Sequence, residues 1–365
     1  MTDPLHRAGG VGTRTAEPGA GDTSGLAPAH KKPPLLTSRR AWLAGAGILG
    51  TACLLRGVSS LVLSPKPPPV TGAAASVRVP LAPPIATPAP APTGPPPLAI
   101  QTATEQEILR NVPTGLTVFR FADDQRILVL DFASLLQQGM MLNRVAALIE
   151  KAGQPRDRVL SDAELVEAIR ADGGTPETYY YGHDYSAASL QRFFTLVDDE
   201  RLPLDPEEAT LRRLLEQVDW FKSDMQAGLI SIPAVGANAN VTLSARGTIL
   251  HHELSHGLFF SDPDYAGFVH HFWNAALTAD ERSEVRRFLG SEGYDTGYEE
   301  LMYNEMQAYL MFTRDPEFFT PARVDMTPRR LANLQAQFLR GMPTGWLQDS
   351  LAATPVLIPA SASRR

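Results

Sequence analysis

The prolines of this 365-residue chain are concentrated towards its N-terminus, and this distribution limits where a packed core can form. Residues 1–37 are rich in Gly, Ala, Pro and Thr without apolar periodicity, which predicts a disordered N-terminus. Residues 64–101 are rich in Pro and Ala and nearly uncharged, which is typical of an extended linker. We therefore expect one globular domain over residues 102–355, followed by a disordered tail at 356–365.

Residues 38–63 have the layout of an export signal. Positive charge precedes an apolar run from Ala41 to Leu55, and the paired Arg39 and Arg40 resemble a twin-arginine signal. The run is short for a membrane span, but an uncleaved inner-membrane anchor through residues 41–63 is the alternative. Both interpretations predict an exported protein, either periplasmic, secreted or anchored at the membrane.

The charge and cysteine content exclude several classes of function. A formal net charge of −7 provides no basic surface for nucleic acid. Cys53 is the single cysteine, so neither an intrachain disulfide framework nor a cysteine-based zinc cluster is available. Cys53 ends the apolar run in a weak likeness to a lipobox, which makes lipidation a minority alternative to a cleaved or retained signal.

The remaining sequence predicts an α+β fold, with a small mixed α/β portion followed by a mainly helical portion. Two β-branched and aromatic runs predict a hairpin, and two acidic capping motifs predict helix starts. A doubly wound sheet would require strands and helices to alternate along the chain, and the sequence does not predict such an alternation. The expected elements are a hairpin of 116–121 and 127–131, helices from Ser161 to Gly173 and from Asp205 to about Gly228, strands at 229–232 and 240–243, and helices after Ala245.

One pentapeptide, His252-Glu253-Leu254-Ser255-His256, carries the clearest chemistry. Residues four apart share a helix face, so both imidazoles can bind one metal ion. Glu253 lies beside them and can take a proton from a water bound to that ion. The alternative is a helix whose surface histidines pair with a glutamate.

Two histidines leave a zinc ion short of protein ligands, and Glu305 is the best candidate for the third. It lies within a predicted helix over 298–310, on an otherwise apolar side where an unpaired carboxylate is costly. Asp262 is the rival. A ligand at that position needs a glycine three residues after His256 for a sharp turn, and Phe259 stands there instead.

The HExxH pentapeptide followed by Asn304-Glu305-x-x-Ala308 resembles the gluzincin metallopeptidases over residues 229–312. The resemblance implies a zincin-like fold, zinc bound by His252, His256 and Glu305, and Glu253 as the general base. It also implies an edge strand ahead of the motif, where 240–243 is the candidate. Thermolysin-like enzymes have an aspartate four residues after the glutamate ligand, whereas this chain has Tyr309. Residues 178–185 and 303–310 also resemble an uncharacterised family of bacterial exported proteins.

Further polar aromatic residues are candidates for a donor to the oxyanion of a reaction intermediate. For each of them, packing with a satisfied polar group is the alternative, and it is favoured. The segment 179–185 either lines a cleft opposite the metal or forms a packing seam, and the seam is slightly favoured. The donor candidates are Tyr298, Tyr303, Tyr309, His270 and His271.

These features together predict an exported zinc-dependent metallopeptidase that hydrolyses peptide bonds with a zinc-bound water activated by Glu253. Its cofactor would be Zn²⁺ and its partner a peptide or protein substrate. The alternatives are a zinc amidase acting on peptidoglycan and a non-catalytic envelope protein braced by zinc. Exopeptidase and endopeptidase action are both compatible with these residues.

Overall fold

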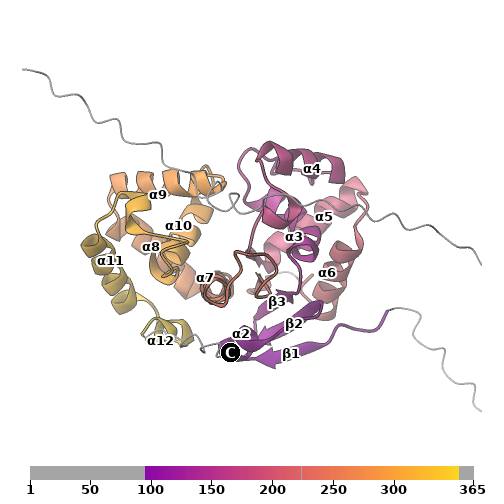
Figure 1. Ribbon diagram of the computed structural model, residues 1–365, viewed down its shortest axis with the longest axis horizontal. Helices are drawn as coiled ribbons and strands as arrows, with labels where there is room; N and C mark the ends of the chain where they lie inside the picture. Colours follow the sequence, from indigo (N-terminus) through magenta and orange to yellow (C-terminus); the bar gives the residue numbers. More distant parts are fainter. Residues whose placement is uncertain (1–94, 223, 353–365) are drawn as a thin grey trace, which may run out of the picture. The chain divides into compact units, whose positions relative to one another are not determined.

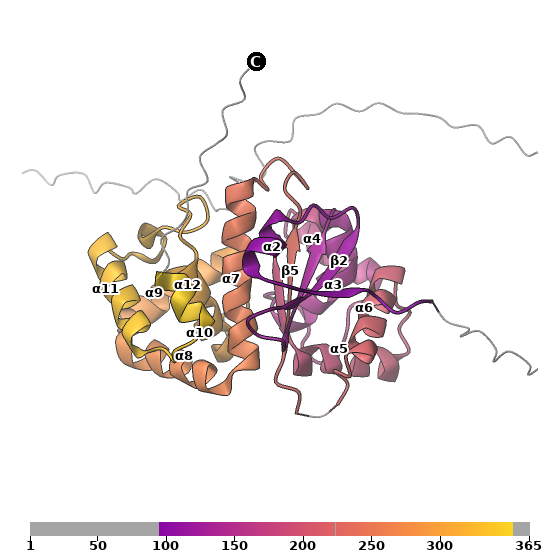
Figure 2. The ribbon, with the colours of Figure 1, turned by 90° about the horizontal axis from the view of Figure 1, so that it is seen from below.

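The computed structural model describes residues 95–222 and 224–352, and their architecture is α+β, as predicted (Figures 1 and 2). The predictions for residues 1–37 and 38–63, for most of the linker and for the C-terminal tail concern residues outside this range. No helix in the described parts of the chain is long and apolar enough to cross a membrane.

The chain forms a sheet portion first and a helical portion second. The sheet portion contains β1 (Ile100–Ala103), α2 (Glu105–Arg110), β2 (Leu116–Phe121), β3 (Ile127–Phe132), α3 (Leu135–Ile149), α4 (Asp162–Ala171), η1 (Pro176–Thr178), β4 (His183–Ser186), α5 (Ala187–Glu200), α6 (Pro206–Gln217) and β5 (Gly228–Pro233). The helical portion contains α7 (Leu243–Ser261), α8 (Pro263–Ala276), α9 (Ala279–Glu292), α10 (Glu299–Gln307), the π-helical turn η2 (Ala308–Phe312), η3 (Pro321–Val324), α11 (Pro328–Gly341) and α12 (Trp346–Ala352).

The five strands form one mixed sheet in the order β1-β2-β3-β5-β4. β2 and β3 pair antiparallel, which confirms the predicted hairpin. β3 and β5 pair in parallel, and β4 then pairs antiparallel with β5 and forms one edge of the sheet. Both ends of the order are therefore short strands of four residues.

Both faces of the sheet are covered, and β3 shows this directly because all six of its residues are buried. Leu128 and Leu130 belong to the core shared with α3, α5 and α6. Ile127 and Val129 point to the opposite face and pack with α2 and α7. This alternation follows from the two-residue period of a strand, and two-sided burial explains why every residue of β3 except Asp131 is apolar.

Helix α7 lies between the sheet and the later helices (Figure 2). Its residues Ile249 and Leu254 pack on the sheet, while Phe259 joins the core of α8–α12. A helix buried on several sides carries polar groups only where they are paired or functional. Gly257 allows the close approach to β3, because a Cβ there would lie 3.0 Å from the side chain of Ile127.

Two expected elements differ in the structure. The helix that begins at Asp205 ends at Gln217, well before Gly228. Residues 240–243 form no strand, because the side chain of Asn238 accepts from two backbone N–H groups in a tight turn. Thr242 then caps α7. The sheet edge close to α7 is β4 instead.

A buried ion pair fixes the start of α7. Arg246 and Asp131 are both fully buried and form two hydrogen bonds of 2.8 Å, one to each carboxylate oxygen. The same guanidinium donates to the carbonyls of Pro233 and Ile108, and Asn111 donates to Asp131. Through these bonds α7 is joined to β3, β5 and α2, and every charge in the group has a partner.

Arg246→Ala should destabilise the fold by about 3–5 kcal/mol, because it leaves the Asp131 carboxylate buried without its cation. Urea unfolding followed by tryptophan fluorescence measures this loss. Arg212→Ala is the matched control, since Arg212 pairs with Asp198 near the surface and should cost about 1 kcal/mol or less. Equal losses in both variants would contradict the role given to the buried pair.

Candidate metal centre

The structure brings together three of the predicted site residues from two helices. His252 and His256 lie one turn apart on α7, and their Nε2 atoms are 3.1 Å from each other. Glu305 on α10 directs its Oε2 to within 3.8 Å of both Nε2 atoms. His256 and Glu305 are fully buried, and His252 retains 9% exposure.

Hydrogen bonds on the far side of each ring fix which nitrogen carries the proton. The Thr313 hydroxyl donates to the carbonyl of Ala308, so its oxygen accepts from Nδ1 of His252 at 2.8 Å. The carbonyl oxygen of Asn304 accepts from Nδ1 of His256 at 2.9 Å. Both Nε2 atoms therefore present lone pairs, and these lone pairs face each other across 3.1 Å.

Such an arrangement is unfavourable without a cation. Two lone pairs and a carboxylate oxygen converge on one point, and neither oxygen of Glu305 has a well-formed hydrogen bond among the described residues. Buried polar atoms are normally paired, so these unpaired acceptors require an explanation. A divalent metal ion could supply it, because it would accept all three lone pairs at once.

Burial determines the protonation of these groups. It lowers the pKa of His256 to about 4, against a weaker opposing effect of the Asn304 hydrogen bond. Burial, followed by the charges of His256 and His251, lowers the pKa of His252 well below its usual range. Both imidazoles are consequently neutral near pH 7, which is the form that binds metal. Burial, then Asp184 and Glu150, raises the pKa of Glu305, and the Tyr294 hydroxyl opposes this shift.

A chain of hydrogen bonds holds α10 against α7. The amide of Gln307 donates to Ser255 on α7 at 3.0 Å and accepts from the Tyr265 hydroxyl at 2.9 Å. The same amide donates weakly to the oxygen of Asn304, which fixes the side chain that accepts from His256. The turn η2 then continues the chain so that Thr313 reaches His252. A π-helical turn at this position is typical of functional sites.

Glu253 lies next to the convergent donors and is held by a glycine. Its Oε2 is buried without a hydrogen-bond partner among the described residues. A Cβ on Gly182 would stand 2.0 Å from Oε1 of Glu253, so any larger residue there would require this carboxylate to move. Burial, followed by the charges of Asp184 and Glu150, raises the pKa of Glu253 well above its usual range.

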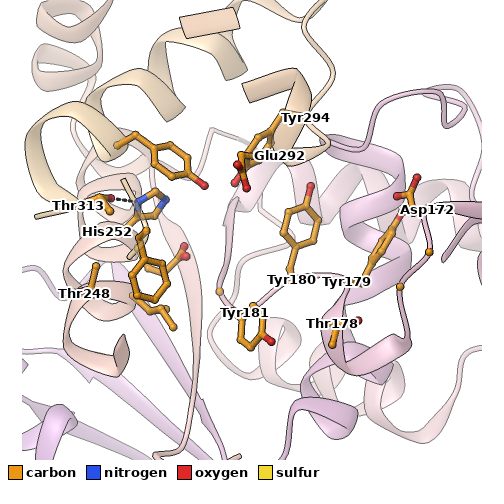
Figure 3. A pocket seen from close by; sticks show the side chains of 17 residues that line it. Asp172, Thr178, Tyr179, Tyr180, Tyr181, Thr248, His252, Glu292, Tyr294 and Thr313 are labelled. Atoms are coloured by element: carbon orange, nitrogen blue, oxygen red, sulfur yellow. Dashed lines mark hydrogen bonds between the residues drawn. The ribbon is translucent and has the colours of Figure 1, made fainter. Parts of the chain in front are cut away.

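A cavity of about 170 Å³ opens onto this group of residues. His252 and Glu253 form part of its lining. Figure 3 shows Tyr179, Tyr180 and Tyr181 across the cavity from His252. The sequence favoured a packing seam for 179–185, but the first part of this segment lines the cavity and only its later residues pair in β4.

Several candidates do not join the site. Asp262 caps α8 and accepts from the backbone of Asp264 and Tyr265, which removes it as a ligand to the same ion. Tyr303 packs on the ring of His270 at 4.9 Å. The exposed candidates are His270, His271 and Tyr298. Among the candidates for an oxyanion donor, Tyr309 contacts one of the candidate metal ligands, with its ring 4.8 Å from that of His252.

Other residues of the site were not assigned a role from the sequence. Thr313 has no motif around it and depends on the turn η2 for its position. Tyr294 lies in a loop and lines the cavity. Asp184 and Glu150 come from distant parts of the chain and add two more buried carboxylates. Asp184 lies within the tyrosine-rich segment 179–185, whose composition was the available signal.

Comparison with known proteins found no matching family model, no similar curated protein and no similar solved structure.

Thr313→Val should weaken Zn²⁺ binding by about 10–100-fold, because it removes the acceptor that holds Nδ1 of His252. Competition with a chromophoric chelator measures the affinity. Thr248→Val is the control, since Thr248 lines the same cavity without a described hydrogen bond to His252. Equal affinity in wild type and Thr313→Val would show that this hydrogen bond does not orient the imidazole.

Proposed function

We propose that this chain is an exported, zinc-dependent peptidase of zincin type, with His252, His256 and Glu305 as the zinc ligands. The observation that carries the proposal is the position of Glu253, a buried carboxylate beside three convergent donors and at the wall of a cavity. Ligands at about 2.0–2.1 Å around a tetrahedral zinc ion stand ~3.3 Å apart. The separations of 3.1 and 3.8 Å between the three donor atoms are close to that spacing.

Zinc bound to these residues would act as a Lewis acid on the scissile carbonyl and lower the pKa of water at the site. Glu253 lies where it can accept the proton of the attacking water. Its raised pKa suits the later transfer of that proton to the leaving amine. The backbone at Gly182 and the motif helix together keep the carboxylate in place.

Two tyrosines supply hydroxyl donors on the wall of the cavity. Tyr294 and Tyr309 both line it, and burial raises the pKa of each well above its usual range. Both hydroxyls therefore remain protonated at neutral pH. A protonated hydroxyl beside the reaction centre can donate to the oxyanion that forms when water attacks a carbonyl.

A zinc ion that only braces two helices has no need of Glu253 or of an adjoining cavity, which favours catalysis over the bracing alternative. The amide bond of a peptidoglycan stem peptide would react by the same chemistry, so substrate assays must include both classes. Export is proposed from Arg39, Arg40 and the apolar run at 41–55.

Glu253→Gln should reduce hydrolysis by about 10²–10⁴-fold and leave zinc content unchanged, because the amide cannot accept a proton. Casein, peptide mixtures and purified peptidoglycan serve as substrates for the zinc-loaded protein, with zinc measured by mass spectrometry. Glu305→Ala is expected to lose zinc as well as activity. Full activity in Glu253→Gln would refute the proposed mechanism, and retention of zinc in Glu305→Ala would remove the third ligand.

Gly182→Ala should lower kcat by about 10²-fold without loss of zinc, since the added methyl group displaces Glu253 from its position. Gly267→Ala on α8 is the control, because a Cβ there meets nothing within 4 Å. Steady-state kinetics and zinc analysis on both variants distinguish a displaced base from a lost metal. If Gly182→Ala were as active as Gly267→Ala, Gly182 would have no positioning role.

A further inference from the structure

A second group of carboxylates adjoins Glu305. Glu150 ends α3, Asp184 lies in β4, and one oxygen from each of these residues lies within 4.8 Å of an oxygen of Glu305 and of the other. The exposed fractions of Glu150, Asp184 and Glu305 are 3%, 9% and 0%. Three separate elements thus direct acidic groups to one buried point.

Glu305 links this group to the histidines. Its Oε2 is the atom nearest both Nε2 atoms, and its Oε1 is equally buried without a well-formed hydrogen bond among the described residues. A carboxylate can bind one cation through each oxygen. The second, unpaired oxygen of Glu305 is therefore available to a cation on the side of Glu150 and Asp184.

Two basic groups lie near Glu150, and each also contacts other residues. Lys151 and Arg156 act on Glu150, but the Lys151 ammonium also lies over the Tyr179 and Tyr180 rings, 4.2 and 3.9 Å from their centroids. Arg156 forms an ion pair with Asp295 at 2.9 Å. Nδ1 of His256 lies 3.6 Å from Asp184, but this imidazole is neutral near pH 7 and its Nδ1 proton is directed to Asn304.

The two groups of donors differ in composition. Glu150, Asp184 and Glu305 contribute oxygen ligands alone, whereas His252 and His256 add two imidazoles to the group that contains Glu305. The group made of oxygen ligands alone suits a hard divalent ion, whereas the group with two imidazoles suits zinc.

We propose that Glu150, Asp184 and Glu305 form a second cation site for a hard divalent ion such as Mn²⁺, with Glu305 shared between the two ions. The inference rests on the proposed function insofar as Glu305 is also a zinc ligand. The second ion neutralises the buried carboxylates and joins α3, β4 and α10 beside the reaction centre.

The test adds Mn²⁺ to the zinc-loaded full-length chain and measures both metals by mass spectrometry after gel filtration. Wild type should retain about one Zn²⁺ and about one Mn²⁺ per chain. Glu150→Gln and Asp184→Asn should retain zinc and bind Mn²⁺ at least about tenfold more weakly, measured as free Mn²⁺ by electron paramagnetic resonance. Glu300→Gln, on the exposed side of α10, is the control and should retain both ions.

Each outcome separates this inference from the proposed function. Zinc without Mn²⁺, or Mn²⁺ that only replaces zinc, overturns the second site and leaves the first intact. Unchanged Mn²⁺ binding in both Glu150→Gln and Asp184→Asn also overturns it. Failure of wild type to bind zinc overturns the proposed function itself. Retained zinc in the variants shows that they are folded, so a loss of Mn²⁺ is then specific.

Discussion

The position of α7 is the constraint on which the rest of the structure depends. One end of this helix is tied to the sheet by the buried pair of Arg246 and Asp131. Its middle packs on the sheet through Ile249 and Leu254, and its last turns enter the core of the later helices. A helix fixed in this way cannot rotate about its axis without breaking both cores. The direction of His252 and His256 is therefore set by packing as much as by their spacing.

The polar groups of the site are costly to bury. Some of them form hydrogen bonds, and others remain able to bind a cation. Gln307 donates to Ser255 and weakly to Asn304, and Asn304 accepts from His256. The acceptors that remain are Glu305 and one oxygen of Glu253. The unpaired carboxylate oxygens of this group thus lie where a cation and a reacting water would be.

The sequence could predict those parts of the fold that depend on local chemistry. The hairpin of β2 and β3 and the capping box at Ser161 depend on nearby residues, and both form as expected. The four-residue spacing in α7 and the carboxylate in the apolar side of α10 likewise identify His252, His256 and Glu305. These patterns are local, so they can be recognised in the sequence without knowledge of the tertiary structure.

The parts that could not be predicted depend on distant contacts. β4 is only four residues long and becomes a strand by pairing with β5. Residues 240–243 have strand-like composition, but the Asn238 side chain competes for their backbone and turns the chain. Thr313 reaches His252 through a π-helical turn that no local pattern marks. Asp184 and Glu150 lie close to Glu305 only because β4, α3 and α10 pack together in the folded protein.

The origin of the ligands couples metal binding to the packing of the two portions. His252 and His256 belong to a helix anchored on the sheet, whereas Glu305 belongs to α10, which packs in the later helical core. An ion held by all three would therefore draw α7 and α10 together, and its binding energy would add to the stability of their interface. Bracing and catalysis are compatible at such a site. What separates them is Glu253, whose buried carboxylate contributes nothing to bracing and is costly to retain unless it handles a proton.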